Sequence, residues 1–161
     1  MGSSLCWTEP KYTFKVAIVN LALWQPPPPH LPLQKCTDAE RRISKRCWDL
    51  AGMQEALRAN RLQVSLSPTA AKDIYTELMW TTEDLLGFMQ CLHGARYRAS
   101  EWGLPAGSHG AADGFPADVY VMGYNRIAGE EGQRRVPWIY FKFAIRPNIG
   151  QVLILSAHPE R

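Results

Sequence analysis

The sequence contains few of the residue patterns that mark a metal site or a disulfide framework. Only four of its 161 residues are cysteine, and no two of them form a C-x-x-C pair. Wide, irregular spacing of this kind predicts neither a zinc site nor a disulfide-stapled fold. The simplest expectation is therefore a reduced, cytoplasmic protein without a metal or another cofactor.

Phosphate-binding loops and hydrolase motifs are missing as well. The glycine-rich segment 103–114 lacks the Lys-Ser/Thr ending of a P-loop, and no G-x-S-x-G occurs in the chain. The pair Glu130-Glu131 is typical of a solvated loop tip rather than of two catalytic carboxylates. These absences exclude the commonest nucleotide-binding and serine-hydrolase signatures.

The chain has neither a large excess of charge of one sign nor a long hydrophobic run. The net charge is only +3, which gives no global reason to expect nucleic acid. Local basic clusters near aromatic residues favour such a partner modestly, although a basic cluster is usually just a solvated face; they lie at 41–46, 96–98, 134–135 and 142–146. The apolar stretch 14–24 is shorter than the roughly 20 residues of a membrane-spanning helix, so we expect no membrane partner.

Proline is concentrated in one place, the segment 26–32, which reads PPPPHLP. Neither a helix nor a central strand accepts such a run, so an extended linker is expected. We divide the chain into an N-terminal extension with this proline-rich linker, residues 1–36, and one domain, residues 37–161.

Helix signals begin directly after the linker. Residues 37–40 (TDAE) form a capping-box pattern, and the helical spacing of apolar residues beyond it predicts one helix that ends at Asn60. A short strand is expected at 62–66. Ser67-Pro68 then predicts the start of a second helix, and Thr81 or Thr82 the start of a third. The third helix has a core stripe made of Leu85, Phe88, Met89 and Leu92.

The C-terminal part of the chain contains three strand-like runs, at 118–120, 138–146 and 151–158. The order of a helix, a strand, two helices and three strands predicts an α+β fold. In this fold the N-terminal helices pack on one face of a mostly antiparallel sheet.

The last two runs form a predicted hairpin. A three-residue loop at 148–150, with Gly150 left-handed, pairs Tyr140 with His158 and Lys142 with Ser156. This register groups Leu153, Leu155 and Ala157 with the phenylalanines of the preceding strand. A four-residue loop would instead place His158 beside Ile139 on the buried face.

The other face of this hairpin offers the chemistry of a phosphate site. Lys142 and Arg146 can hold an RNA phosphate, and Tyr140 can stack on a base. His158 can transfer a proton near neutral pH. The alternative is a solvated outer face with a hydrogen-bonded terminal histidine.

Several segments between residues 40 and 160 resemble, in order, those of the MqsR family, the ribonuclease toxins of bacterial toxin–antitoxin pairs. They are Ala70-Ala71, Leu92, Arg96-Tyr97-Arg98-Ala99-Ser100, Asp118-Val119-Tyr120, Ile139-Tyr140-Phe141-Lys142 and Val152-Leu153-Ile154-Leu155-Ser156. The resemblance implies a RelE-like fold and a metal-independent endoribonuclease that cuts mRNA through attack of the ribose 2′-OH and so inhibits translation. It also implies a cognate antitoxin protein as partner.

Carried over by position, the resemblance implies a catalytic set of Arg98, Tyr140 and His158. Together with the hairpin face, it leads us to expect RNA contacts from Arg96, Tyr120, Lys142, Arg146 and Ser156.

The chain departs from the family pattern at two of these places. Ala117 stands where the family has glutamine, and Arg98 where it has lysine. A guanidinium does not deprotonate and makes a poor general base, so His158 would take over proton transfer. The missing glutamine and the proline-rich extension favour an alternative, a non-catalytic RNA-binding or protein-interaction module on the same scaffold.

Overall fold

The computed structural model describes residues 20–104 and 114–161, which build one mixed but mostly antiparallel sheet. The strand order is β1-β3-β4-β6-β7-β2, and β5 pairs with β4 beside this path. Only the β2–β7 pair is parallel among the described strands. The strands are β1 (Arg42–Ile43), β2 (Gln63–Leu66), β3 (Tyr97–Gly103), β4 (Phe115–Asn125), β5 (Glu130–Glu131), β6 (Trp138–Arg146) and β7 (Gln151–Pro159).

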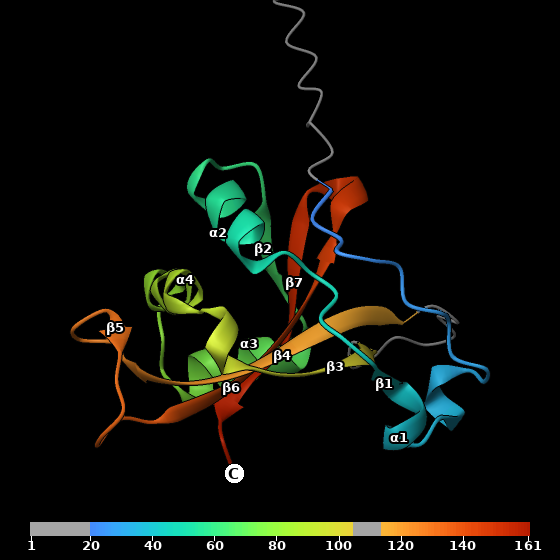
Figure 1. Cartoon of the computed structure of the whole chain (residues 1–161). Helices are drawn as coiled ribbons and strands as arrows, with labels where there is room; N and C mark the ends of the chain where they lie inside the picture. The colour runs from blue at the N-terminus through green and yellow to red at the C-terminus, as the bar shows by residue number, and fades with distance from the viewer. Residues whose placement is uncertain (1–19, 105–113) are drawn as a thin grey trace, which may run out of the picture.

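The α-helices are α1 (Asp38–Arg41), α2 (Leu50–Arg58), α3 (Pro68–Lys72) and α4 (Thr82–Cys91), and α3 continues as a π-helix, η2 (Asp73–Glu77). Three of the helices, α2, α3 and α4, enclose the main core with one face of this sheet, whereas α1 has no buried residue and lies beside β1 (Figure 1). Short 3-10 turns are η1 (Leu33–Lys35), η3 (Gly94–Arg96) and η4 (Pro147–Ile149). The predicted α+β class with a mostly antiparallel sheet is therefore confirmed.

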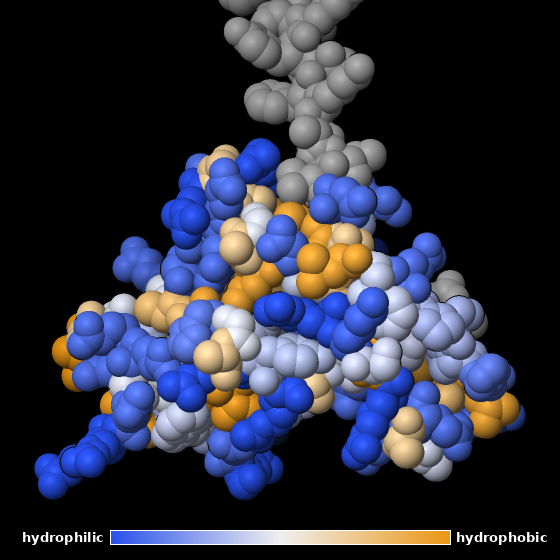
Figure 2. Space-filling view, in the orientation of Figure 1, coloured by the Kyte–Doolittle hydropathy of each residue, from blue (hydrophilic) through white to orange (hydrophobic). Residues whose placement is uncertain are grey.

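The surface in the view of Figure 2 is mostly hydrophilic, with a patch of hydrophobic surface beside α2. Among the helices that the structure describes, none is both long enough and apolar enough to cross a membrane.

Local capping residues start two helices where the sequence predicts. The Ser67 hydroxyl accepts the N–H of Ala70 at 3.1 Å, with Pro68 in the first helical position. Thr81 and Asp84 form a reciprocal capping box at the start of α4. The core stripe of α4 is buried as expected; it consists of Leu85, Phe88, Met89 and Leu92.

The single helix predicted for residues 37–60 is wrong. Thr37 caps only the one turn of α1, because the chain then becomes extended and Arg42–Ile43 pairs with β3. A new helix, α2, starts at Leu50, where the Asp49 side chain accepts the N–H of Gly52 at 3.0 Å. The apolar spacing that suggested one helix is thus shared between an edge strand, a connection and a shorter helix.

A buried carboxylate explains why the chain leaves the helix at this point. Asp118 on β4 is fully buried and accepts the backbone N–H groups of Cys47 and Trp48, each at 2.9 Å. It also accepts the Ser100 hydroxyl at 2.6 Å. Burial raises the pKa of the Asp118 carboxyl, whereas these hydrogen bonds oppose that rise. An uninterrupted helix would use the two N–H groups internally and leave the buried Asp118 carboxylate with Ser100 as its remaining partner.

The C-terminal hairpin has the predicted register at its far end and a different one near the turn. Tyr140 pairs with His158 and Lys142 with Ser156, as expected, and Gly150 is left-handed with φ of 61°. Near the turn, however, Arg146 pairs with Gln151, so the loop has four residues instead of three.

A β-bulge restores the register. Leu155 is the extra residue between the pairs Lys142–Ser156 and Phe143–Ile154. Leu153 and Leu155 therefore pack with Ala117 and Ala144 in a small second cluster, away from the main core. Grouping these two leucines with the phenylalanines was wrong, whereas Ala157 does belong to the main core.

Part of the N-terminal extension packs against the domain. The proline-rich segment forms neither helix nor strand, as predicted. Leu21 joins the main core, and its carbonyl oxygen accepts the N–H of Asp49 at 2.8 Å. Leu33 is also buried. Residues 1–19 lie outside the described chain, so the division at residue 36 stays a prediction.

Replacing Asp118 with alanine should destabilise the protein by about 3 kcal/mol or more, since it leaves buried backbone donors without an acceptor. Urea unfolding measures this change. Glu55→Ala, on the exposed side of α2, removes the same charge and should change stability by less than about 0.5 kcal/mol. Equal losses in the two variants would contradict the role given to Asp118.

Candidate functional site

The candidate site lies on the outer face of the sheet, the face away from the main core. Strands β3 and β7 are separated by β4 and β6, which in a flat sheet would place them about 14 Å apart. Yet a Cβ atom on Gly103 of β3 would lie only 2.8 Å from Leu155 Cδ1 of β7. The sheet is therefore strongly curved, and side chains from distant strands meet across its outer face.

His158 and Tyr140 stack on this face, near the end of the sheet where β7 stops. Their rings stack at a centroid distance of 4.9 Å and an interplanar angle of 9°. His158 Nδ1 lies 2.8 Å from the carbonyl oxygen of Pro159, which can only accept a hydrogen bond. Nδ1 is thus the donor, and Nε2 is left as the nitrogen that can exchange a proton with a ligand.

Tyr140 acts as a hydrogen-bond donor rather than as a base. Burial raises the pKa of Tyr140 to about 12, and the charge of Glu101 adds to the rise, whereas Arg98 opposes it. The phenol therefore keeps its proton at neutral pH.

Two cations flank the stack, and each is paired with a carboxylate. Lys142 Nζ lies 2.6 Å from Glu101 Oε1, and both side chains are less than one third exposed. Arg98, which is half exposed, pairs with Glu160. The two acids belong to the site as much as the cations do, but the sequence analysis missed both.

The remaining predicted residues of the hairpin lie on the same face. The Arg146 guanidinium lies 5.4 Å from the centre of the Phe115 ring. Ser156 pairs with Lys142 in the β6–β7 register and is half buried. The structure thus brings together Arg98 and four of the five hairpin residues, Tyr140, Lys142, Ser156 and His158. Arg146 shares their face but lies six residues from Tyr140, at the turn end of β6, so it is not part of the same cluster.

Two predicted RNA-contacting residues lie elsewhere. Tyr120 is fully buried among core aromatics on the helix side of the sheet, so the expectation that it contacts RNA is wrong. The alternation of β4 points Val119 and Val121 outward instead. Arg96 lies in η3, just before the start of β3, where it contacts Glu131 and lies 5.4 Å from the Trp138 ring centre.

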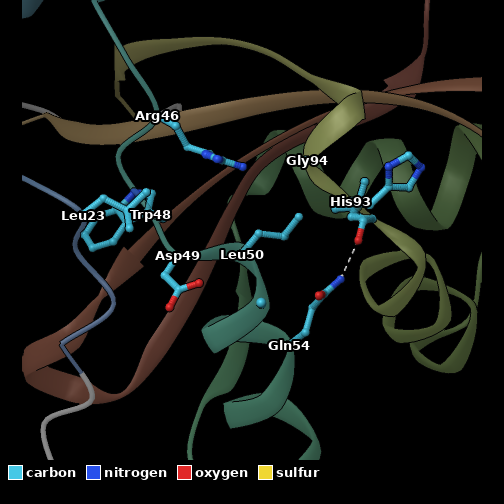
Figure 3. Close-up of a pocket in the computed structure, with 10 residues that line it drawn as sticks. Leu23, Arg46, Trp48, Asp49, Leu50, Gln54, His93 and Gly94 are labelled. Carbon is cyan, nitrogen blue, oxygen red and sulfur yellow. Dashed lines mark hydrogen bonds between the residues drawn. The ribbon is translucent and has the colours of Figure 1, made fainter.

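A separate cavity of about 360 Å³ lies on the helix side (Figure 3). Arg46 points into it, and Asp49 and Gln54 line it. Two of the polar side chains that line this cavity serve helix ends: Asp49 caps α2, and Gln54 Nε2 donates to the carbonyl oxygen of Leu92 at 2.8 Å, after the end of α4. His93 pairs with Glu131. The cavity therefore has a structural explanation.

No cluster of three or more histidine, cysteine, aspartate or glutamate side chains that could hold a metal ion occurs within residues 20–104 and 114–161. Comparison with known proteins adds no relative, since no family model, curated protein or solved structure matches this chain. The residues of the outer face are therefore the main indication of function among the described residues.

Gly103→Ala should destabilise the protein by about 1 to 3 kcal/mol, because the new methyl group meets Leu155 and the stem of Lys142. Thermal or urea unfolding measures the effect. In Gly94→Ala the methyl group would meet only the flexible end of Arg46, at 3.3 Å, so the change should be small. A stable Gly103→Ala variant would contradict the close approach of β3 and β7.

Proposed function

We propose that this chain is a metal-independent endoribonuclease, the toxin of a bacterial toxin–antitoxin pair with a RelE-like, MqsR-type site. The observation that carries the proposal is a histidine stacked on a high-pKa tyrosine between two cation–carboxylate pairs. RNA cleavage without a metal requires one proton acceptor, one proton donor and positive charge at the phosphate. The outer face holds all three.

In the proposed reaction, the Glu101 carboxylate takes the proton of the ribose 2′-OH. The 2′-oxygen forms a bond to phosphorus, and the bond from phosphorus to the 5′-oxygen breaks. Protonated His158 gives its Nε2 proton to the leaving 5′-oxygen. The products are a 2′,3′-cyclic phosphate and a 5′-hydroxyl end.

Lys142 and Arg98 stabilise the charge that develops on the phosphate oxygens, and Tyr140 donates a hydrogen bond to one of them. Without RNA, Glu101 and Glu160 neutralise these two cations. A phosphate that enters the site takes over the cations from these carboxylates, and Glu101 is thereby released to act as a base.

The order of the resembling segments supports the assignment to this toxin class. Arg98, Tyr140, Lys142 and Ser156 come from three separate segments of the resemblance and lie on one face of the sheet. The proposed partners are therefore mRNA as substrate and an antitoxin protein as inhibitor. Ala117, which stands where the family has glutamine, favours the second candidate, a non-catalytic module on the same scaffold.

His158→Ala should reduce cleavage at least 100-fold, the usual cost of losing a proton-transfer group. The assay uses a long defined mRNA with EDTA present and ribosomes absent, and the ends of the fragments are analysed. His30→Ala is the matched control, because His30 is exposed and lies beside Trp102, which packs on the main-core side of β3 and not on the outer face, so this variant should cut like the intact protein.

The same assay decides between the candidates. Equal cutting by the intact protein and His158→Ala would remove His158 from the mechanism. A lack of cuts on both free mRNA and translating ribosomes would overturn the nuclease and leave the non-catalytic module.

Expression in bacteria gives an independent test of the toxin assignment. We expect the intact chain to arrest growth and the His158→Ala variant to be tolerated. Co-expression of a gene encoded beside this one should relieve the arrest. Normal growth despite high-level accumulation of the intact, folded chain would contradict the assignment to a toxin.

A further inference from the structure

A groove separate from the outer face lies at the end of the sheet where β7 stops. It has a volume of about 540 Å³, within the range of pockets that hold a nucleotide-sized ligand. It is formed between the connection from η2 to α4 and the segments around β5. Pro159, which lines the groove, directly follows His158 of the candidate site. Because neighbouring strand residues point to opposite faces, His158 and Pro159 lie on the two sides of the end of β7, and an RNA strand would have to turn around this end to reach the groove from His158.

The groove carries unbalanced positive charge. Arg135 is exposed, lines the groove and has no acidic partner within the described part of the chain. Arg126 donates to the carbonyl oxygen of Met79 at 2.9 Å and lies 3.8 Å from Asp84. The acid that lines the groove, Glu77, is already paired with Arg161.

The backbone at the groove is held in a costly conformation. Arg135 and Met79 are left-handed, with φ of 57° and 54°, and such a conformation costs on the order of 1 kcal/mol for a residue other than glycine. Ile127 lines the same groove and is 94% exposed, so an apolar surface for a base or ribose stands beside the cations.

We propose that this groove binds the RNA nucleotide next to the cleaved phosphate, with Arg135 contacting its phosphate and Ile127 its base or sugar. The inference rests on the proposed nuclease function for the position of the cleaved bond. The position of the groove next to His158, around the end of β7, together with the unpaired charge of Arg135, favours RNA over a protein partner as the occupant.

The test compares Arg135→Asn with Arg134→Asn, both made in the His158→Ala background so that the RNA stays intact. Arg134 is the matched control, because it is the exposed neighbour with the same charge but does not line the groove. Asparagine adopts the left-handed conformation readily, so Arg135→Asn removes the charge without adding strain. Thermal unfolding checks that both variants fold.

Binding of a fluorescently labelled single-stranded RNA is measured by anisotropy at several salt concentrations. We expect Arg135→Asn to weaken binding about 10-fold and to lower the slope of log affinity against log salt by about 0.7, the value for one lost phosphate contact. Arg134→Asn should weaken binding less than about two-fold and leave the slope nearly unchanged.

The outcomes separate the groove from the nuclease. Equal effects of the two variants would indicate general charge attraction and would overturn the proposal that the groove binds RNA. An absence of effect in both variants would also overturn that proposal. The nuclease would stand in both cases if the intact chain still cuts RNA. Conversely, selective loss of binding in Arg135→Asn with no cutting by the intact chain would keep the groove as an RNA site and overturn the nuclease.

Discussion

The buried carboxylate of Asp118 is the interaction on which the arrangement of this fold depends. It joins the connection at residues 47–48 to β4, about 70 positions later in the chain, and it also holds Ser100 of β3. Because its acceptor oxygens have no access to water, every donor must be in place before the carboxylate can be buried. Helix α2, the edge strand β1 and the sheet are thereby fixed relative to one another.

The same interaction explains which parts of the fold the sequence could predict. Ser67 and Thr81 cap helices through atoms three residues away, so their effect is visible in a short sequence window. The prediction of one helix that ends at Asn60 was wrong for the opposite reason. Its local pattern was helical, but Asp118 binds the N–H groups that an uninterrupted helix would need. No local pattern contains that competitor.

On the outer face, too, some contacts could be predicted from the sequence and others could not. Alternation along β6 and β7 correctly grouped Tyr140 with His158, because a wrong loop length and an unforeseen bulge at Leu155 compensate each other by one residue each. The same alternation placed Leu153 and Leu155 on the wrong face of the sheet, because the bulge interrupts the two-residue repeat of side-chain directions. Glu101 was missed because it reaches Lys142 from β3, a strand that is separated from β6 by β4 and far from it in the sequence.

The contact between Glu101 and Lys142 also decides what chemistry the face can support. Without Glu101, the face would present Lys142, Arg98, Tyr140 and His158 with no carboxylate beside the lysine. By reaching Lys142 from β3, Glu101 adds a carboxylate whose charge is felt at Tyr140. The price is that both cations are neutralised at rest, so an anion must displace a carboxylate to bind. Phosphate competes well for this exchange, since it offers several acceptor oxygens to a guanidinium or an ammonium group. The exchange would free a base next to the reacting group only when that group is present, and this is the physical argument for an enzyme rather than a passive RNA surface.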